Sequence, residues 1–441
     1  MNRTAEPPNL ARLLLPASMI VSFLAASAAP TPLYAVYADR WHYSPITTTT
    51  VFGSYTLAVL AALLVFGRAS EHLGRKPVLF GALALQIVAM IVFIRAGDVT
   101  ALLGGRTLQG VATGSALGPL GAALLDVDRD RGTRANSAAP GLGTGLGALS
   151  SGLIVEYLPA PTQLVYVVFI AVFVVQALGV ALLLAPGRRR PGLLASLAPE
   201  LSVPPRLRGS LISVAPVLFA VWSLGGFYGS LVPALTRQLS GSDSVVIGAL
   251  GLFALTTVSS ATTVVITRAA PRPVMFLGIA LLVLGSLGTL TALDAASIAV
   301  FFLSTVVSGI GFGAGLQGGL RTVLPLADEH ERPGVLSSIY VICYLGMGVP
   351  AIAAGVLVVD GGGLGVATRD YSWFVITFAM ITLLALACTA RGDHGRRPTR
   401  SSDADTDSAP CTTGCIRPRP SATDPAEPAL DRPADAPGAP R

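Results

Sequence analysis

Long hydrophobic stretches dominate the chain and are separated by short polar connections. Twelve stretches are apolar over roughly 20 residues, the length that one helix needs to cross a bilayer. We predict these spans at 11–35, 46–67, 77–96, 100–124, 136–158, 163–185, 211–235, 245–267, 273–293, 297–324, 334–359 and 371–390. The pattern therefore predicts an all-α integral membrane protein with twelve transmembrane helices.

The first apolar stretch resembles a signal peptide, because it follows Arg3 and Arg12 and contains Ala-Ser-Ala. A cleaved signal has an apolar core of about 7–15 residues and precedes soluble sequence. This stretch instead reaches Tyr37, and eleven further hydrophobic stretches follow it. We therefore expect an uncleaved first helix.

The composition agrees with a membrane protein. Of the 441 residues, 52% are hydrophobic and only 12% are charged, and the mean hydropathy is +0.68. Soluble domains carry about 25% charged residues, so a water-soluble globular fold is excluded. The net charge of +6 could suggest nucleic acid as a partner. Its distribution along the chain gives it a topological meaning instead.

Positive charges are concentrated on alternate connections between the spans. With a cytoplasmic N-terminus, 25 Lys and Arg residues fall on the cytoplasmic side, and only Arg40, Arg95, Arg237 and Arg369 fall outside. Cytoplasmic loops of membrane proteins carry this excess. The sequence therefore predicts that both termini are cytoplasmic in a multi-pass bacterial cell (inner or plasma) membrane protein.

The longest internal connection, 186–210, is rich in arginine and proline and lies halfway along the chain. The segment GVATGSALG at 110–118 resembles GIGFGAGLQ at 309–317, which suggests a duplicated unit. A final segment rich in proline and charge has the composition of disordered chain. We predict an N-terminal six-helix bundle at 1–185, a cytoplasmic linker at 186–210, a C-terminal six-helix bundle at 211–390 and a disordered cytoplasmic tail at 391–441.

The connection between the second and third spans reads GRASEHLGRKP. It resembles the G-x-x-x-D-x-x-G-R-R/K signature of the major facilitator superfamily, and Glu71 takes the place of its Asp. The matching residues are Gly67, Glu71, Gly74, Arg75 and Lys76. The resemblance implies two pseudo-symmetric six-helix bundles, as in drug/proton antiporter-like bacterial permeases, and a cytoplasmic gate at which this loop latches the two halves. The alternative is that its charges only follow the positive-inside rule.

Arg106 is the one charged residue placed well inside a span. An arginine in hydrocarbon is costly unless it faces a partner or a wet cavity. Gln109 and Thr113 lie on the same helix face at i+3 and i+7. The segment GGRTLQGVATG resembles the superfamily's R-x-x-Q-G motif, whose arginine is implicated in proton coupling in drug exporters. The structural alternative is that Arg106 binds backbone carbonyls freed by Pro30 and Pro32.

Glycines line two of the spans at spacings that allow helices to pack closely. In the fifth span, GLGTGLGALSSG partly resembles the superfamily's antiporter motif, G-x-x-x-G-P-x-x-G-G, although Ala148 stands at the position of its proline. This departure leaves both export and import open. The expected packing glycines are Gly110, Gly114, Gly143, Gly147 and Gly152.

Carboxylates and histidines all fall in loops or near the ends of the predicted spans, apart from those in the tail. A central proton relay of Asp, Glu or His is therefore not expected. If protons are coupled, Asp39 and Glu156 near the outer face are the available carboxylates, with Arg106 as their expected partner. Arg106→Ala is then expected to abolish transport, and Asp39→Asn or Glu156→Gln to identify the proton carrier.

Several aromatic and amide side chains are candidates to line a transport path. They are Tyr34, Trp222, Tyr228, Gln317, Tyr340 and Tyr344. For Tyr34 and Tyr228 the alternative is an interfacial aromatic belt, and for Gln317 it is a hydrogen bond between packed helices. An aromatic cavity with little charge favours a neutral, amphipathic or lipophilic cationic cargo, whereas an unpaired Arg106 favours an anion.

These features predict a monomeric secondary transporter that works by alternating access and exports a hydrophobic compound or drug in exchange for protons. Proton-coupled uptake of a metabolite is the first alternative, and a non-transporting membrane scaffold or sensor is the second. No catalytic cluster is found, and the only lysine, Lys76, does not lie in a P-loop. We therefore expect no enzyme activity, cofactor, metal or nucleic-acid partner.

Overall fold

Helices make up nearly all of the chain that the structure describes. The computed structural model describes residues 10–67, 69–184, 201–328 and 330–394, and at 69 and 387–394 the backbone alone. No strand is found within these ranges. The helices of the first half are α1 (Leu10–Ala28), α2 (Pro30–Trp41), α3 (Pro45–Phe66), α4 (Ala69–Leu73), α5 (Arg75–Arg95), α6 (Val99–Val127), α7 (Arg129–Tyr157) and α8 (Pro161–Leu183).

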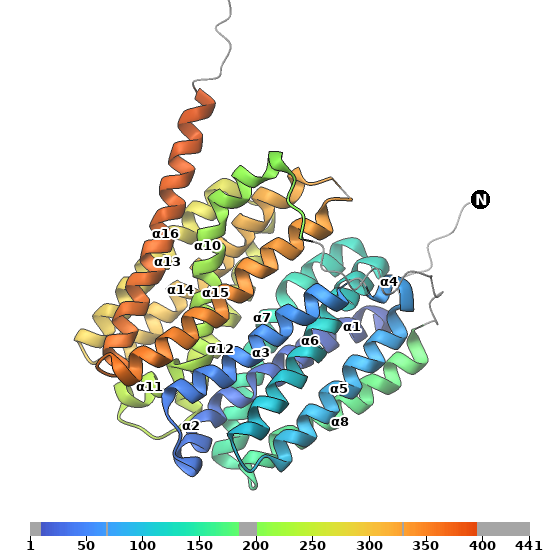
Figure 1. The fold of residues 1–441 in the computed structure, drawn as a ribbon, viewed down its shortest axis with the longest axis vertical. Helices are drawn as coiled ribbons and strands as arrows, with labels where there is room; N and C mark the ends of the chain where they lie inside the picture. Colours follow the sequence, from blue (N-terminus) through green and yellow to red (C-terminus); the bar gives the residue numbers. More distant parts are fainter. Residues whose placement is uncertain (1–9, 68, 185–200, 329, 395–441) are drawn as a thin grey trace, which may run out of the picture. The chain divides into compact units, whose positions relative to one another are not determined.

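The second half repeats this all-helical build. Its helices are α10 (Pro205–Ser230), α11 (Val232–Ser240), α12 (Val245–Val265), η1 (Ile266–Arg268), α13 (Pro271–Asp294), α14 (Ile298–Val323), η2 (Leu324–Leu326), α15 (Arg332–Asp360) and α16 (Leu364–His394). Twelve helical segments of the described chain are long and apolar enough to cross a membrane, with α1 and α2 together forming the first (Figure 1). The predicted number of spans is confirmed.

Three helices begin six or seven residues before the predicted spans: α7 at Arg129, α10 at Pro205 and α16 at Leu364. Hydropathy locates the apolar part of a helix, whereas polar first turns continue beyond it. In α7, the Asp128 side chain accepts hydrogen bonds from the N–H groups of Asp130 and Arg131, which caps the helix before its apolar part. The predicted linker is shortened accordingly, and its residues 186–200 lie outside the described chain.

Proline interrupts the first helix of each half. Pro30 begins α2 and has no N–H, so the carbonyl of Ala26 lacks its helical donor. Pro233 lies in the first turn of α11 and deprives the Gly229 carbonyl of its donor in the same way. The Thr31 hydroxyl donates to this Gly229 carbonyl over 3.3 Å. The two breaks therefore meet in one buried contact.

Two large hydrophobic cores organise the helices. One is built almost entirely from side chains of α1 to α8, and the other almost entirely from side chains of α10 to α16. The main contacts between the two sets join α3 to α15 and α7 to α12, and Figure 1 shows each pair side by side. By contacts, residues 1–392 form one unit and 393–441 a second, which lies almost wholly outside the described chain. The division into two bundles with a linker and a tail stays a prediction.

Close helix contacts occur at the predicted packing glycines. A Cβ added at Gly110 or Gly114 of α6 would lie 2.6 Å or 2.5 Å from a carbonyl oxygen of α3. A Cβ at Gly143 or Gly147 of α7 would lie 2.5 Å or 2.1 Å from a carbonyl oxygen of α1. A Cβ at Gly152 would lie 2.8 Å from a side-chain carbon of α12. These helices pack backbone against backbone, so they hold the buried polar groups between them in fixed positions.

Candidate functional site

Arg106 lies on α6 and is buried, with 1% of its surface exposed. Its Nη1 donates to the Ser27 carbonyl and to Oε1 of Gln109, both over 2.7 Å. Nε2 of Gln109 donates in turn to the Ala26 carbonyl over 2.9 Å. This is the carbonyl that Pro30 deprives of its helical donor. The structural alternative expected Arg106 to bind carbonyls freed by Pro30 and Pro32. Gln109 instead binds the freed Ala26 carbonyl, whereas Arg106 binds the neighbouring Ser27 carbonyl. Both side chains therefore lie at the break in the first helix.

The guanidinium of Arg106 also packs against aromatic rings. Its central carbon lies 4.4 Å from the ring centre of Tyr55 on α3 and 6.0 Å from that of Tyr34 on α2. The face of an aromatic ring attracts a cation, more strongly where water is excluded. Tyr55 was not among the predicted site residues. Tyr55 is an aromatic residue near the middle of the second predicted span, as Trp222 and Tyr344 are in theirs. This position was the signal that could have identified it.

A row of buried hydrogen bonds continues from Arg106 along α6. The Thr113 hydroxyl donates to the Gln109 carbonyl over 2.9 Å. Nε2 of Gln86, on α5, donates to the Thr113 hydroxyl oxygen over 3.2 Å. Thr113 was expected to share the face of Arg106, whereas Gln86 was not predicted. A buried amide within a hydrophobic span was the signal that could have identified it.

Two donors of Arg106 remain unused. Its Nε and Nη2 atoms are buried and form no hydrogen bond with any described residue. The same holds for the Tyr34 hydroxyl and for Nε1 of Trp222. Oε1 of Gln86, in the same row of hydrogen bonds, is also without a partner among the described residues. Buried polar groups are nearly always hydrogen-bonded, so the polar network around Arg106 is incomplete in this structure.

An aromatic cluster lies beside Arg106 and includes residues of both halves. The rings of Trp222 on α10 and Tyr344 on α15 lie 4.8 Å apart, and Tyr340 lies 6.4 Å from Tyr344. Tyr55 and Tyr344 belong to one hydrophobic cluster, against which Trp222 packs. Tyr344 is buried, whereas Tyr340 is 37% exposed and lies at the edge. The structure thus places Tyr34 and Tyr55 beside Arg106, and it connects Trp222 and Tyr344 to this group through Tyr55.

Tyr228 and Gln317 are not brought to this cluster. The Tyr228 hydroxyl shares a 2.8 Å hydrogen bond with Thr305, and its ring stacks on Phe301 in the core of the second half. Gln317 on α14 is half-buried. Tyr228 thus has a hydrogen-bond partner of its own, in the protein core.

The two predicted proton carriers lie elsewhere as well. Asp39 faces Nη1 of Arg237 at 3.6 Å. Glu156 accepts hydrogen bonds from the Ser244 hydroxyl over 2.7 Å and from the Val246 N–H over 2.9 Å. No described carboxylate pairs with Arg106, so the expectation that Asp39 or Glu156 is its partner is wrong for this structure. The reason is position, because both acids lie at exposed helix ends whereas Arg106 lies deep in α6.

These carboxylates connect the two halves instead. Asp39 on α2 and Glu156 on α7 belong to the first half, and Arg237 and Ser244 belong to the second. Both contacts lie at the end of the bundle that the charge pattern predicts to face outside, which we call the outer end. The opposite end is the inner end. Polar contacts between the halves thus gather at the outer end, although the Ser260 hydroxyl of α12 also donates to the Ala138 carbonyl of α7 nearer the inner end.

The predicted gate motif lies at the inner end, and its contacts stay within the first half. Arg75 forms an ion pair with Asp126 at the end of α6. Nζ of Lys76 donates to the Ala181 carbonyl of α8 over 2.7 Å. Gly74 has a φ of 84°, which favours glycine, and Glu71 forms no ion pair with a described residue. Gly67 caps α3 and donates its N–H to the Leu63 carbonyl. The latch between the two halves thus stays a prediction about a conformation other than this one.

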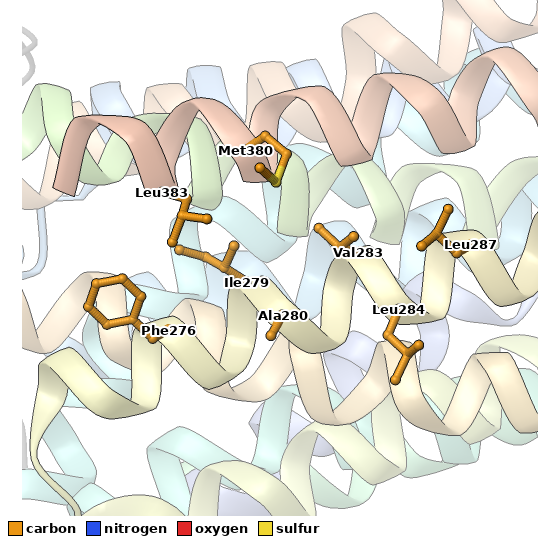
Figure 2. Close-up of a pocket in the computed structure, with 8 residues that line it drawn as sticks. All are labelled: Phe276, Ile279, Ala280, Val283, Leu284, Leu287, Met380 and Leu383. Carbon is orange, nitrogen blue, oxygen red and sulfur yellow. The ribbon is translucent and has the colours of Figure 1, made fainter. Parts of the chain in front are cut away.

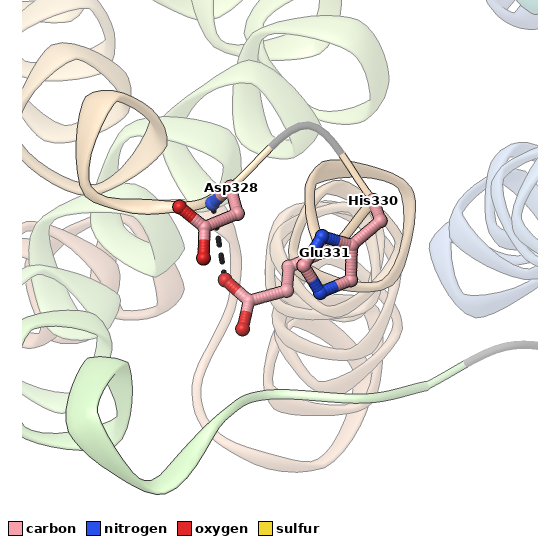
Figure 3. Close-up of side chains that lie close together, drawn as sticks. All are labelled: Asp328, His330 and Glu331. Carbon is pink, nitrogen blue, oxygen red and sulfur yellow. Dashed lines mark hydrogen bonds between the residues drawn. The ribbon is translucent and has the colours of Figure 1, made fainter.

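Asp328, His330 and Glu331 form the one cluster in the described chain with side chains close enough to share a metal ion (Figure 3). Arg206 at the start of α10 forms ion pairs with both carboxylates, over 2.6 Å in the case of Asp328. The guanidinium lowers the pKa of Asp328. Because Arg206 already pairs with both carboxylates, we assign them to the joining of α10 to the start of α15.

An apolar groove of about 610 Å³ lies between α13 and α16 (Figure 2). Its lining is entirely hydrophobic: Phe276, Ile279, Ala280, Val283, Leu284, Leu287, Met380 and Leu383. None of these side chains belongs to the aromatic cluster around Tyr55 and Tyr344. The groove is thus separate from the candidate site.

Twelve spanning helices that enclose a buried polar and aromatic cluster between two helix sets define a polytopic protein with the build of a membrane transporter. Residues 15–266, more than half of the chain, match the family model of the Major Facilitator Superfamily. The chain belongs to this superfamily of transporters.

Curated relatives match a shorter part of the chain. It is 37% identical over 112 residues to a triacylglyceride transporter of Mycobacteroides abscessus, covering 24% of this chain and 22% of that protein. It is 39% identical over 114 residues to a triacylglyceride transporter of Mycobacterium tuberculosis, with the same coverage. The matched region thus spans less than a quarter of these relatives' length.

Among solved structures, the POT family transporter PepTSo resembles this chain in fold. The TM-score is 0.65 and the sequence identity 12%, over 88% of this chain and 99% of that protein. This likeness shows the shared all-α transporter fold.

Proposed function

We propose that the protein is a secondary active carrier that exports a lipophilic small molecule across the cell membrane in exchange for protons. The observation that carries this proposal is the cluster of Arg106, Tyr55, Trp222 and Tyr344, to which both halves contribute. A site shared by two halves is suited to open to either side in turn. The relatives named triacylglyceride transporters support a lipophilic cargo.

The contacts between the halves support alternating access. At the outer end, Asp39, Glu156 and Thr31 each bind a residue of the other half. At the inner end, the ion pairs of Arg75 and Arg206 each join helices of one half. Toward that end, the halves share a hydrogen bond from the Ser260 hydroxyl to the Ala138 carbonyl. This arrangement suits a carrier closed at its outer end, and a transport cycle requires the outer contacts to break. On the charge pattern, we place both termini in the cytoplasm.

Proton movement distinguishes export by exchange from uptake by symport. Purified protein is reconstituted in liposomes that contain pyranine, a pH-sensitive dye, and decyl sulfate, decanamide or decyltrimethylammonium is added outside. Exchange makes the lumen alkaline as cargo enters, whereas symport makes it acidic, and this sign does not depend on how the protein inserts. We expect alkalinisation with at least one of these amphiphiles, beyond that of protein-free liposomes.

Acidification would replace the proposal with the uptake alternative. If none of the three amphiphiles moved protons or accumulated in inside-out vesicles under an imposed pH gradient, the result would favour the non-transporting scaffold.

Glu156→Gln is expected to shift the protein toward conformations with an open outer end. The carboxylate accepts hydrogen bonds from the first turn of α12, where a negative charge is favourable, and the amide lacks that charge. Spin labels at the exposed positions Tyr157 and Gln238, one on each half, report the opening by double electron–electron resonance. The matched control is Asp360→Asn, also at the outer end. Unchanged distances in Glu156→Gln would show that this contact does not hold the halves together.

A further inference from the structure

The side of Arg106 that faces away from its backbone partners carries the unused donors. Nη1 is occupied by the Ser27 carbonyl and by Gln109. Nε and Nη2 are buried and have no partner among the described residues. In a guanidinium, the Nε–H and one N–H of Nη2 point in the same direction and form a fork that binds two oxygens of one acidic group. We call these two donors the Nε–Nη2 edge.

The charge of Arg106 is not neutralised within the described chain. The ring face of Tyr55 compensates part of it, but no described carboxylate forms an ion pair with Arg106. The nearby acids suggested by the sequence pair with other groups, Asp39 with Arg237 and Glu156 with Ser244. A buried charge without an ionic partner is costly, so an anion that reaches this site gains a strong interaction.

Two further donors of the site form no hydrogen bond with a described residue. The Tyr34 hydroxyl is buried, and its ring centre lies 6.0 Å from the guanidinium carbon. Nε1 of Trp222 is also free, and its ring packs 4.8 Å from that of Tyr344. The site therefore combines a cationic fork and a hydroxyl donor at one end with aromatic surface at the other.

We propose that the cargo is an anionic amphiphile, with its carboxylate, sulfate or phosphate head group bound by the Nε–Nη2 edge of Arg106. Its apolar part lies against Tyr55, Trp222 and Tyr344. This inference rests on the proposed function, because the same cluster is the proposed transport path. The inference adds that the cargo is negatively charged. Since Nε and Nη2 are buried here, the head group enters in a more open conformation.

The test compares three amphiphiles with the same decyl chain: decyl sulfate, decanamide and decyltrimethylammonium. Their binding to the purified full-length protein is measured by isothermal titration calorimetry below their micellar concentrations. We expect decyl sulfate to bind at least about tenfold more tightly than decanamide, a difference of about 1.4 kcal/mol. Decyltrimethylammonium is expected to bind most weakly, because its charge is the same as that of Arg106.

Variants assign this preference to the guanidinium edge. Arg106→Gln is expected to remove the preference for decyl sulfate, and Arg106→Lys to remove most of it, because lysine keeps the charge but lacks the fork. Arg321→Gln is the matched control. Arg321 also donates to backbone carbonyls, those of Ile266 and Ala269 at the inner end, and its loss is expected to leave the preference unchanged. Tyr34→Phe removes one hydroxyl and is expected to weaken decyl sulfate binding alone, by a few-fold, even if the Arg106 variants do not fold.

The inference is overturned if the wild type binds decanamide or decyltrimethylammonium as tightly as decyl sulfate, or binds none of them. It is also overturned if folded Arg106→Gln keeps the preference. Failure of the proposed function gives a different result, in which decyl sulfate binds through Arg106 and yet moves no protons in the pyranine assay.

Discussion

Arg106→Ala is expected to abolish transport and to lower the thermal stability of the protein. The change leaves the Ser27 carbonyl and Gln109 without their donor, and each buried polar group left unsatisfied costs about 1–3 kcal/mol. It also removes the cation that packs on Tyr55. Transport is measured by the pyranine assay in liposomes, and stability by thermal unfolding in detergent.

Arg106→Lys distinguishes the functional role of Arg106 from its structural one. Lysine keeps the charge and can donate to the Ser27 carbonyl or to Gln109, so we expect most of the stability to return. It cannot also present the Nε–Nη2 edge, so transport is expected to stay at least about tenfold slower than in the wild type, or about 1.4 kcal/mol. A purely structural arginine would instead show stability and transport recovering together. Unchanged transport rate and pH dependence in Arg106→Ala would contradict the functional role, and unchanged thermal stability would contradict the structural one.

Gly147→Ala is expected to destabilise the protein by about 3 kcal/mol, the upper part of the range for overpacking. The new Cβ would lie 2.1 Å from the Ala25 carbonyl oxygen and 2.3 Å from its Cα. Backbone cannot rotate away as a side chain can, so α1 and α7 must separate. The same movement displaces Ala26 and Ser27, whose carbonyls bind Gln109 and Arg106. The readouts are thermal unfolding in detergent and the yield of folded protein in membranes.

Gly81→Ala is the matched control for this substitution. Gly81 lies within α5, and a Cβ there would meet nothing within 4 Å. Alanine favours helix over glycine by about 1 kcal/mol, so this variant is expected to be as stable as the wild type or slightly more so. If Gly147→Ala unfolded at the same temperature as Gly81→Ala, close packing of α1 against α7 would not be limiting for stability.

The parts of the fold set by local sequence could be predicted. Hydropathy identified the twelve spans because each needs its own apolar length. Helix spacing placed Gln109 and Thr113 beside Arg106, because residues three and four apart share a face. The missing N–H of Pro30 indicated a carbonyl that needs a donor. Each of these inferences depends on residues close together in the chain.

The features that depend on tertiary packing could not be predicted. Tyr55 reaches Arg106 only because α3 packs against α6 at Gly110 and Gly114. Asp39 and Glu156 share the outer end with Arg237 and Ser244 of the other half, which one sequence does not reveal. Helix starts were misplaced for another reason, since polar first turns such as that of α7 carry no hydropathy signal.

The break at Pro30 places two contacts of different kinds only four residues apart in the chain, one within the first half and one between the halves. Ser27 before the break accepts a hydrogen bond from Arg106, and Thr31 after it donates to Gly229 of the other half. Under the proposed function, a ligand that moves Arg106 therefore acts on the same few peptide units that carry the Thr31 contact between the halves. Thermodynamic linkage makes such an effect mutual. A ligand at Arg106 is then expected to shift the equilibrium between a closed and an open outer end. Loosening the Thr31 contact is expected to change the affinity of that ligand by the same factor, although Thr31 and Arg106 do not touch each other.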